Sequence, residues 1–307
     1  MALTASVPRS AGALDRPRYA AGDFWTYASN LTMDPGFRFV GNTTIEADVV
    51  RMISVQNESV EALRLRISGG GTFEASFEPF GSASGAWTVI GSEDWESGTW
   101  KSVRSHVRLT ASGALRGGPT PLSFALTVEN ETTRRVLRDT WPWPIDVLSA
   151  GDMTAHWVAA QNVTLEVLGS PSQQNASAVE GDFTTRYAAE RTERVTVRAG
   201  TFEATLIREE GPEGGHRLRW FSARVGNEVR QEEYNATGTR VAVSDLTAFR
   251  YAAGEPPPPF PWIYVVLASL AGVIGVLLAL LARRPKRPLE VWMPPDTTPV
   301  DPARPSS

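Results

Sequence analysis

Hydrophobic and polar residues alternate along much of the chain between residues 18 and 251. In one stretch Leu63, Leu65 and Ile67 fall on one side of an extended chain, and Arg64 and Arg66 on the other. A period of two with one polar side indicates antiparallel sheet with one face toward water. The pattern predicts strands over 45–55, 60–67, 72–80, 86–95, 100–110, 121–128, 163–168, 183–189, 194–198, 202–208, 217–222, 228–234 and 240–251.

Glycine clusters punctuate these predicted strands. Gly69–Gly71, Gly117–Pro119 and Gly211–Gly215 read as turns, because glycine and proline favour the conformations that turns require. No amphipathic helix is evident before residue 255. We therefore expect a mainly β protein of antiparallel sheets, either half-barrels or sandwiches.

The pattern changes completely at residues 260–282, which contain no charged side chain. A helix of this length spans about 35 Å, enough for a hydrocarbon core of about 30 Å. We expect one transmembrane helix, preceded by a stiff proline-rich stalk at 255–259 and followed by a disordered tail at 283–307. Pairs of small residues four apart could form a weak dimer face in the bilayer; they are Ala268 with Gly272 and Ala271 with Gly275.

Two independent features orient this span. Basic residues follow it directly at Arg283, Arg284, Lys286 and Arg287, which favours a cytoplasmic C-terminus. Seven of the eight asparagines begin an N-x-[S/T] sequon, the acceptor for N-linked glycans in exported chains. All seven precede the span, so we expect the large N-terminal part outside the cell, glycosylated at Asn30, Asn42, Asn57, Asn130, Asn162, Asn175 and Asn235.

The first residues pose a problem for this topology. Residues 1–23 contain no apolar stretch of the length that a secretory signal needs. Three explanations are open: Met1 is not the true start, the chain is a processed form, or the domain stays inside the cell. The sequons favour the first, with a signal upstream of Met1. Residues 1–17 are predicted to be disordered.

The outer part contains similar segments twice. "YAAGDFW" at 19–25 resembles "LSAGDMT" at 148–154, and "GGGTFEASF" at 69–77 resembles "RAGTFEATL" at 198–206. A second alignment matches "VEALRLRI" to "FEATLIRE", and Trp95 and Val103 to Trp220 and Val229. Both alignments stay open, and both predict two tandem β units, at 18–140 and 141–254.

Several of these motifs carry a resemblance. "GDFWTY", "AGTFEATLIR", "WFSARVGNEVRQ" and "GAWTVIGSEDW" resemble a loose set of exported archaeal β-proteins without an established activity. The resemblance covers 18–110 and 147–251, and it implies curved sheets similar in shape to the half-barrel of bacterial lipoprotein carriers. The first half departs from the pattern, since "DWESGTWKSV" lacks a glycine equivalent to Gly226 of "WFSARVGNEVRQ". The motif residues are expected to be structural; they are Gly22, Asp23, Trp25, Trp95, Gly151, Asp152, Gly200, Phe202, Trp220 and Gly226.

Aromatic residues of these motifs have two interpretations. They fill the core under a sheet, or they line a groove for an apolar or sugar ligand. The core interpretation is favoured.

Signatures of catalysis are scarce. Without cysteine, the chain has no disulfide, thiolate metal site or cysteine nucleophile. His106, His156 and His216 lie apart in strand-like segments, and we expect them on strand surfaces rather than on a metal. Two acidic runs are interpreted as solvated turns rather than calcium loops; they are Glu93, Asp94 and Glu96, and Glu209, Glu210 and Glu213.

The charge and the motifs leave three hypotheses. A net charge of −4 without a basic patch argues against nucleic acid. The leading hypothesis is a glycosylated, non-catalytic surface protein with a binding or envelope-structural role and no cofactor or metal. Its partners would be the bilayer and an envelope protein or apolar ligand. The alternatives are a carrier of lipid or other apolar molecules, and an envelope hydrolase.

Overall fold

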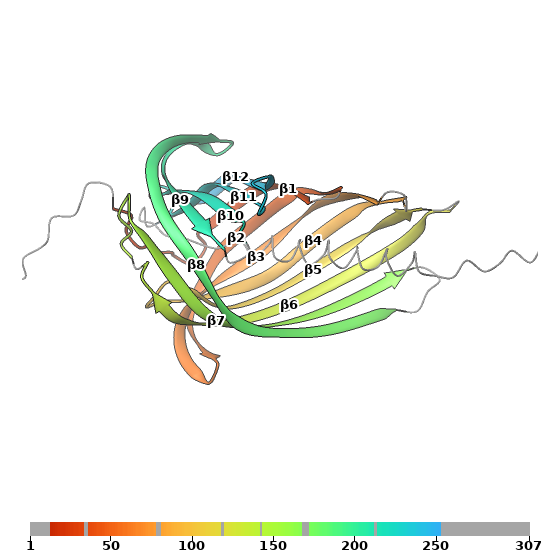
Figure 1. Cartoon of the computed structure of the whole chain (residues 1–307), viewed down its shortest axis with the longest axis horizontal. Coiled ribbons are helices and arrows are strands. Elements are labelled where there is room, and N and C mark those ends of the chain that lie inside the picture. Colours follow the sequence, from red (N-terminus) through yellow and green to blue (C-terminus); the bar gives the residue numbers. More distant parts are fainter. Residues whose placement is uncertain are drawn as a thin grey trace, which may run out of the picture.

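Antiparallel strands make up almost all of the described chain. The computed structural model describes residues 13–33, 36–77, 81–117, 120–141, 143–167, 172–211 and 214–252. The strands are β1 (Phe24–Met33), β2 (Phe37–Val55), β3 (Glu58–Phe77), β4 (Gly81–Glu96), β5 (Ser102–Arg116), β6 (Leu122–Asp139), β7 (Ala150–Val167), β8 (Gln173–Val197), β9 (Gly200–Glu210), β10 (His216–Ser222), β11 (Asn227–Tyr234) and β12 (Arg240–Arg250) (Figure 1). The mainly β prediction is confirmed.

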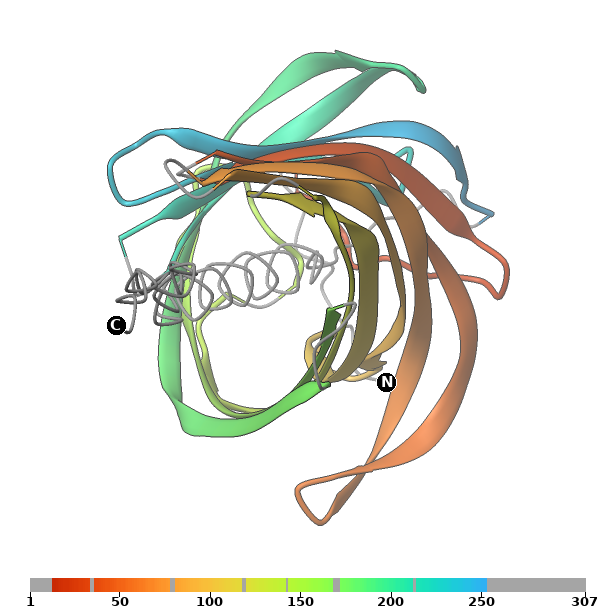
Figure 2. The same ribbon diagram turned by 90° about the vertical axis from the view of Figure 1, so that its right-hand side faces the viewer.

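Each strand pairs with its neighbour in sequence, and β1 pairs with β12, so the sheet closes into a barrel (Figure 2). Separate half-barrel units are not confirmed, since β6 pairs with β7 and both halves share one ring. The predicted boundary at 140/141 does fall between β6 and β7, so each half supplies six consecutive strands.

Among the described residues no helix is long and apolar enough to cross a membrane. The predicted stalk, span and tail at 255–307, with the small-residue pairs inside them, lie outside the described residues.

The halves match in strand order, which bears on the two open alignments. Trp95 is the penultimate residue of β4 and Trp220 lies near the end of β10, and each stands beside a register shift. Val103 and Val229 lie near the starts of β5 and β11. The second alignment thus places its matches at equivalent points of the fourth and fifth strands of each half.

One predicted turn is wrong. Gly69–Gly71 lie within β3, paired with β2 on one side and β4 on the other. A Cβ at Gly71 would lie 2.0 Å from the Val40 carbonyl oxygen, and one at Gly69 2.5 Å from that of Asn42. The glycines therefore allow a close backbone approach inside a long, curved strand, which is a known use of glycine in sheets.

The lumen is layered along the barrel axis. We call the first layer the apolar end: aliphatic side chains and the rings of Phe39, Phe73, Trp87 and Phe124 are buried together there. The ring centroids of Phe73 and Phe124 lie 5.9 Å apart, and those of Phe39 and Phe73 5.8 Å apart. These rings come from β2, β3, β4 and β6, so side chains from different walls meet at this end and fill it.

The opposite end, here the aromatic end, is covered by two segments outside the ring. Leu14 pairs with Ile145, and both are buried with Trp141 and Phe221. Arg16 donates to the carbonyl oxygens of Ser97 and Gly98, both at 3.0 Å. Leu14 belongs to the core although it lies within the segment 1–17 predicted to be disordered; residues 1–12 of that segment lie outside the described part.

Candidate functional site

Between these two ends lies a polar layer, built from one or two inward positions of most strands. Along β1 the inward order is Tyr27, Ser29, Leu31, and along β12 it is Leu246, Ser244, Ala242. Ser29 and Ser244 hydrogen-bond at 2.7 Å. The other buried members of the polar layer are Thr43, Glu93, Ser105, Asn130, Thr132, Thr185, Glu209, Arg217, Arg219, Glu228 and Gln231.

Ion pairs concentrate on β9, β10 and β11. Arg217 and Arg219 lie on one side of β10 and donate to the two oxygens of Glu209, at 3.2 and 3.3 Å. Arg219 also donates to Glu228, and Arg217 lies 3.7 Å from Glu233. Burial raises the pKa of Glu228, and the arginines only partly oppose it. Such pairs cost desolvation and are weak evidence of stability, so a role at the adjoining cavities explains them better.

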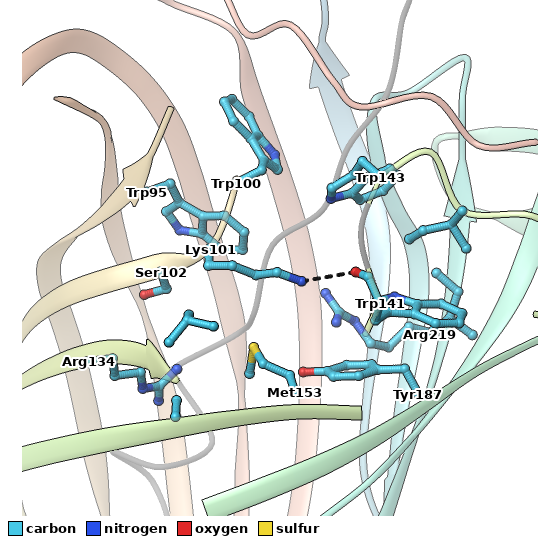
Figure 3. A pocket seen from close by; sticks show the side chains of 14 residues that line it. Trp95, Trp100, Lys101, Ser102, Arg134, Trp141, Trp143, Met153, Tyr187 and Arg219 are labelled. Carbon is cyan, nitrogen blue, oxygen red and sulfur yellow. Dashed lines mark hydrogen bonds between the residues drawn. The ribbon is translucent and has the colours of Figure 1, made fainter. Parts of the chain in front are cut away.

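A cavity of about 80 Å³, here the tryptophan cavity, adjoins this network at the aromatic end (Figure 3). One wall comes from the β4–β5 hairpin, with Trp95, Trp100, Lys101 and Ser102. The facing wall carries Trp141 and Trp143 from the β6–β7 connection, together with Tyr187 and Arg219. Its remaining lining residues are Arg134, Val136, Ile145, Met153, Ala155 and Ile207.

The hairpin turn aims its side chains inward. Trp100 has a φ of +58°, which is rare for a bulky residue, and its backbone N–H donates to the Glu96 carbonyl oxygen at 2.8 Å. Lys101 donates to the Trp141 carbonyl oxygen at 3.4 Å and pairs with Asp139 at 3.1 Å. Burial lowers the pKa of Lys101 in spite of Asp139.

A larger cavity of about 420 Å³ lies next to the tryptophan cavity, and Arg134, Met153 and Tyr187 line both. Its walls carry Trp157 and Phe183 beside charged groups of the polar layer. Beside this cavity, residues 173–185 of β8 pair with β7 alone among the described strands, and β9 joins β8 from Arg186 onward.

The predicted sequons occupy different environments. Asn42, Asn57, Asn162 and Asn175 are exposed, and Asn30 and Asn235 are half-buried. The Asn235 side-chain oxygen accepts three hydrogen bonds from Thr237 and Thr239. Asn130 is 8% exposed and lines the larger cavity. Glycan attachment at each site stays a prediction.

The predicted structural motifs fall on turns and core positions. Asp23 is buried, and its carboxylate accepts from the backbone N–H of Ala20 and Ala252, which joins the two ends of the ring. Its counterpart Asp152 is exposed and pairs with Arg186 at 3.3 Å. Gly22, Gly200 and Gly226 have positive φ, and Gly151 packs against the Thr140 carbonyl oxygen.

Aromatic residues of the motifs mostly fill the core at the aromatic end. Trp25, Phe202 and Trp220 are buried in one cluster. The indole N–H of Trp25 donates to the Val225 carbonyl oxygen at 2.8 Å, and that of Trp220 donates to Glu193 at 2.6 Å. Trp95 belongs to the same cluster and also lines the tryptophan cavity.

The histidines lie apart, as predicted. His106 is exposed on β5. His156 bonds Asp182 at 2.7 Å and lies 3.3 Å from Glu180 on exposed parts of β7 and β8. His216 stacks on Tyr234 at 4.7 Å and lines the larger cavity. In the described part of the chain no cluster of three metal-ligating side chains occurs.

The interpretation of the acidic runs as solvated turns is wrong for three residues. Glu93 and Asp94 are buried in β4, and Glu209 is buried in β9. Asp94 is neutralised by Arg64 through two bonds of 2.7 Å and by Arg104 at 3.3 Å. Arginines on neighbouring strands make burial of these carboxylates possible. The sequence alone does not predict these ion pairs, because they depend on the register between strands.

Sequence reasoning missed most of the site. The pattern predicted an ordinary strand over 100–110, which begins with Trp100, Lys101 and Ser102. The predicted boundary between the two units falls just before Trp141 and Trp143. The density of tryptophan in "DWESGTWKS" and "TWPWP" was the available signal.

Comparisons with known proteins add little. No protein-family model matches the chain, and no curated protein matches it in sequence. One solved structure, a "putative exported protein with YmcC-like fold" from Bacteroides fragilis NCTC 9343, is similar over 78% of this chain and 99% of its own. The identity is 12% and the TM-score 0.29, so the likeness carries no weight for function.

Proposed function

We propose that this chain is an exported, membrane-anchored binding protein that takes up a small molecule in its lumen and leaves it chemically unchanged. The observation that carries the proposal is the pair of neighbouring cavities beside the polar layer, which share three lining residues. Ligand sites are concave, largely apolar and supplied with a few placed polar groups. Here tryptophans and Phe183 supply the apolar surface, and the polar layer supplies charges and hydrogen-bond donors.

The packing at the apolar end argues against the alternative of a lipid carrier. A long acyl chain needs a continuous apolar cavity, but the walls meet at the apolar end, where Phe73 packs on Phe124. The larger cavity, at about 420 Å³, suits a compact molecule with aromatic and polar parts. A compact ligand is therefore the form of the proposal that we favour.

Location outside the cell is supported by the sequence. The basic residues after 282 favour an inside C-terminus, and four sequons lie on exposed positions of the barrel. Protease treatment of intact cells, followed by immunoblotting for both ends of the chain, tests this topology. We expect loss of the barrel and protection of the tail; protection of both would contradict it.

Retention of a ligand is tested on the full chain purified from its membrane. Native mass spectrometry should show a mass excess that disappears on denaturation, with release of a small molecule. Ala159 lines the larger cavity, whereas its neighbour Ala160 is exposed. Ala159→Trp should abolish the mass excess and Ala160→Trp should retain it. Equal occupancy in both variants, or no excess in the unmodified protein, would overturn the proposal.

A further inference from the structure

We infer that the tryptophan cavity is a subsite for the carboxylate of an organic acid whose body lies in the larger cavity. This inference rests on the proposed function and names the chemical class of its ligand. Three independent observations meet in this cavity: buried donors without partners, a lining of cations without carboxylates, and a strained turn that holds one of the donors.

Three polar atoms of the hairpin wall lack a hydrogen-bond partner among the described residues: Trp95 Nε1, Trp100 Nε1 and Ser102 Oγ. Their residues are 5, 6 and 9% exposed, so bulk water does not solvate them. Buried donors in folded proteins are nearly always paired, and an unpaired one carries its full desolvation cost. By contrast, the indole N–H groups of Trp25, Trp87 and Trp220 are all bonded.

The lining as a whole offers donors rather than acceptors. Its polar side chains are indoles, a lysine, two arginines, a serine and a tyrosine, of which only Ser102 and Tyr187 carry a side-chain oxygen that can accept. A sugar or a water molecule would bring O–H donors of its own that need acceptors. An ionised carboxylate only accepts, at two oxygens with about four lone-pair positions. The lining therefore matches a carboxylate better than a neutral hydroxyl-rich group.

Charge supports the same choice. Lys101, Arg134 and Arg219 line the tryptophan cavity, and among the described residues no aspartate or glutamate does. Outside this lining, Asp139 pairs with Lys101, and Glu209 and Glu228 pair with Arg219. Because burial lowers the pKa of Lys101 even beside Asp139, a second anion in the cavity would stabilise its charged form.

Backbone strain marks the same wall. Trp100 lies in the left-handed region with a φ of +58°, held by bonds that close the β4–β5 turn. Strained residues persist where the surroundings impose them, and they gather at ligand sites. A glycine here would relieve the strain but would remove the indole that faces the cavity.

The neighbouring position of the two cavities places the rest of the ligand. Met153, Tyr187 and Arg134 line both spaces, so only these side chains stand between a group in the tryptophan cavity and the larger cavity beside it. There Trp157 and Phe183 offer aromatic surface. The expected ligand is thus an acid with a compact apolar or aromatic body.

The test uses 3-phenylpropionate and its neutral amide as probes. Binding is measured by calorimetry on the full chain in lipid nanodiscs, after removal of any bound molecule, with empty nanodiscs as the blank. We expect the acid to bind at least about tenfold more tightly than the amide, because bonds to a charged acceptor are the stronger ones. Trp100→Phe and Ser102→Ala should each weaken the acid about three- to tenfold and leave the amide unchanged.

Trp87→Phe is the matched control, since it removes an indole N–H that donates to the Thr72 carbonyl oxygen at the apolar end. It should leave the affinity for the acid unchanged. Circular dichroism of each variant confirms that the barrel has folded.

Three results would overturn the inference. Equal affinity for acid and amide would leave the proposed function intact but remove the carboxylate subsite. Unchanged acid binding in both Trp100→Phe and Ser102→Ala would place the site elsewhere. Binding of neither probe would indicate a cavity filled by ordered water only; the mass-spectrometric test of a retained ligand then decides the proposed function separately.

Discussion

The apolar end and the aromatic end of this barrel use the same β scaffold for opposite purposes. At the apolar end, inward positions carry aliphatic and phenylalanine side chains whose walls meet across the lumen. At the aromatic end and the polar layer beside it, the inward positions include Glu209, Arg217 and Arg219, and two cavities adjoin them. The packing of the apolar end stabilises the ring. The buried charges and cavities at the other end lower the stability of the fold, as the proposed binding site would require.

The largest expected effect lies at the apolar end. Phe73 is 1% exposed and packs on both Phe39 and Phe124. Phe73→Ala should lower the free energy of unfolding by about 3–5 kcal/mol, because it removes buried surface and leaves a cavity. Guanidinium unfolding followed by tryptophan fluorescence measures the change. Phe73→Leu should cost much less, and a similar cost for both substitutions would mean that packing across the lumen is not what stabilises this end.

A somewhat smaller loss of folding stability is expected from a substitution in the polar layer. Arg219 is buried between Glu209 and Glu228. Arg219→Met leaves these carboxylates without their shared partner, so it should cost about 3 kcal/mol in the same unfolding experiment.

The control for Arg219 is an exposed ion pair. Arg66 lies 2.7 Å from Asp48 with 61% of its side chain exposed, and Arg66→Met should cost less than about 1 kcal/mol. If Arg219→Met were as mild as Arg66→Met, the polar layer would have to be hydrated, and the contrast between the ends would be weaker than we argue.

The same contrast explains what could be predicted from the sequence. The alternation of Leu63, Leu65 and Ile67 gave the correct inward face of β3, because a half-buried strand needs only local pattern. Closure of the ring was not accessible, since it depends on β1 pairing with β12 more than two hundred residues away in the chain. Gly69–Gly71 were misread for a related reason: their role lies in neighbouring strands rather than in a local turn.

The site was harder to predict than the fold. In β10, Arg217 and Arg219 alternate with Leu218 and Trp220. For a strand with one face toward water, this pattern predicts the arginines outside and the apolar residues inside. The structure has both faces of β10 covered, with Leu218 and Trp220 packed on the aromatic core and the arginines in the polar layer. Alternation identifies two faces, but only tertiary structure tells which of them meets water.

The smallest predicted effect is also the sharpest test of the contrast, because its sign differs between two buried serines. Ser102 Oγ is buried in the tryptophan cavity without a partner among the described residues, whereas Ser29 Oγ bonds Ser244 at 2.7 Å. In the ligand-free protein, Ser102→Ala removes an unsatisfied hydroxyl and should stabilise the fold by about 0.5–1 kcal/mol. Ser29→Ala should destabilise it by about 1 kcal/mol, since it leaves the Ser244 hydroxyl without this bond. Differential scanning calorimetry of both variants should therefore show shifts of opposite sign. A loss of stability in Ser102→Ala would mean that its hydroxyl is already satisfied in the free protein, and the tryptophan cavity would then hold no reserve of binding energy for a ligand.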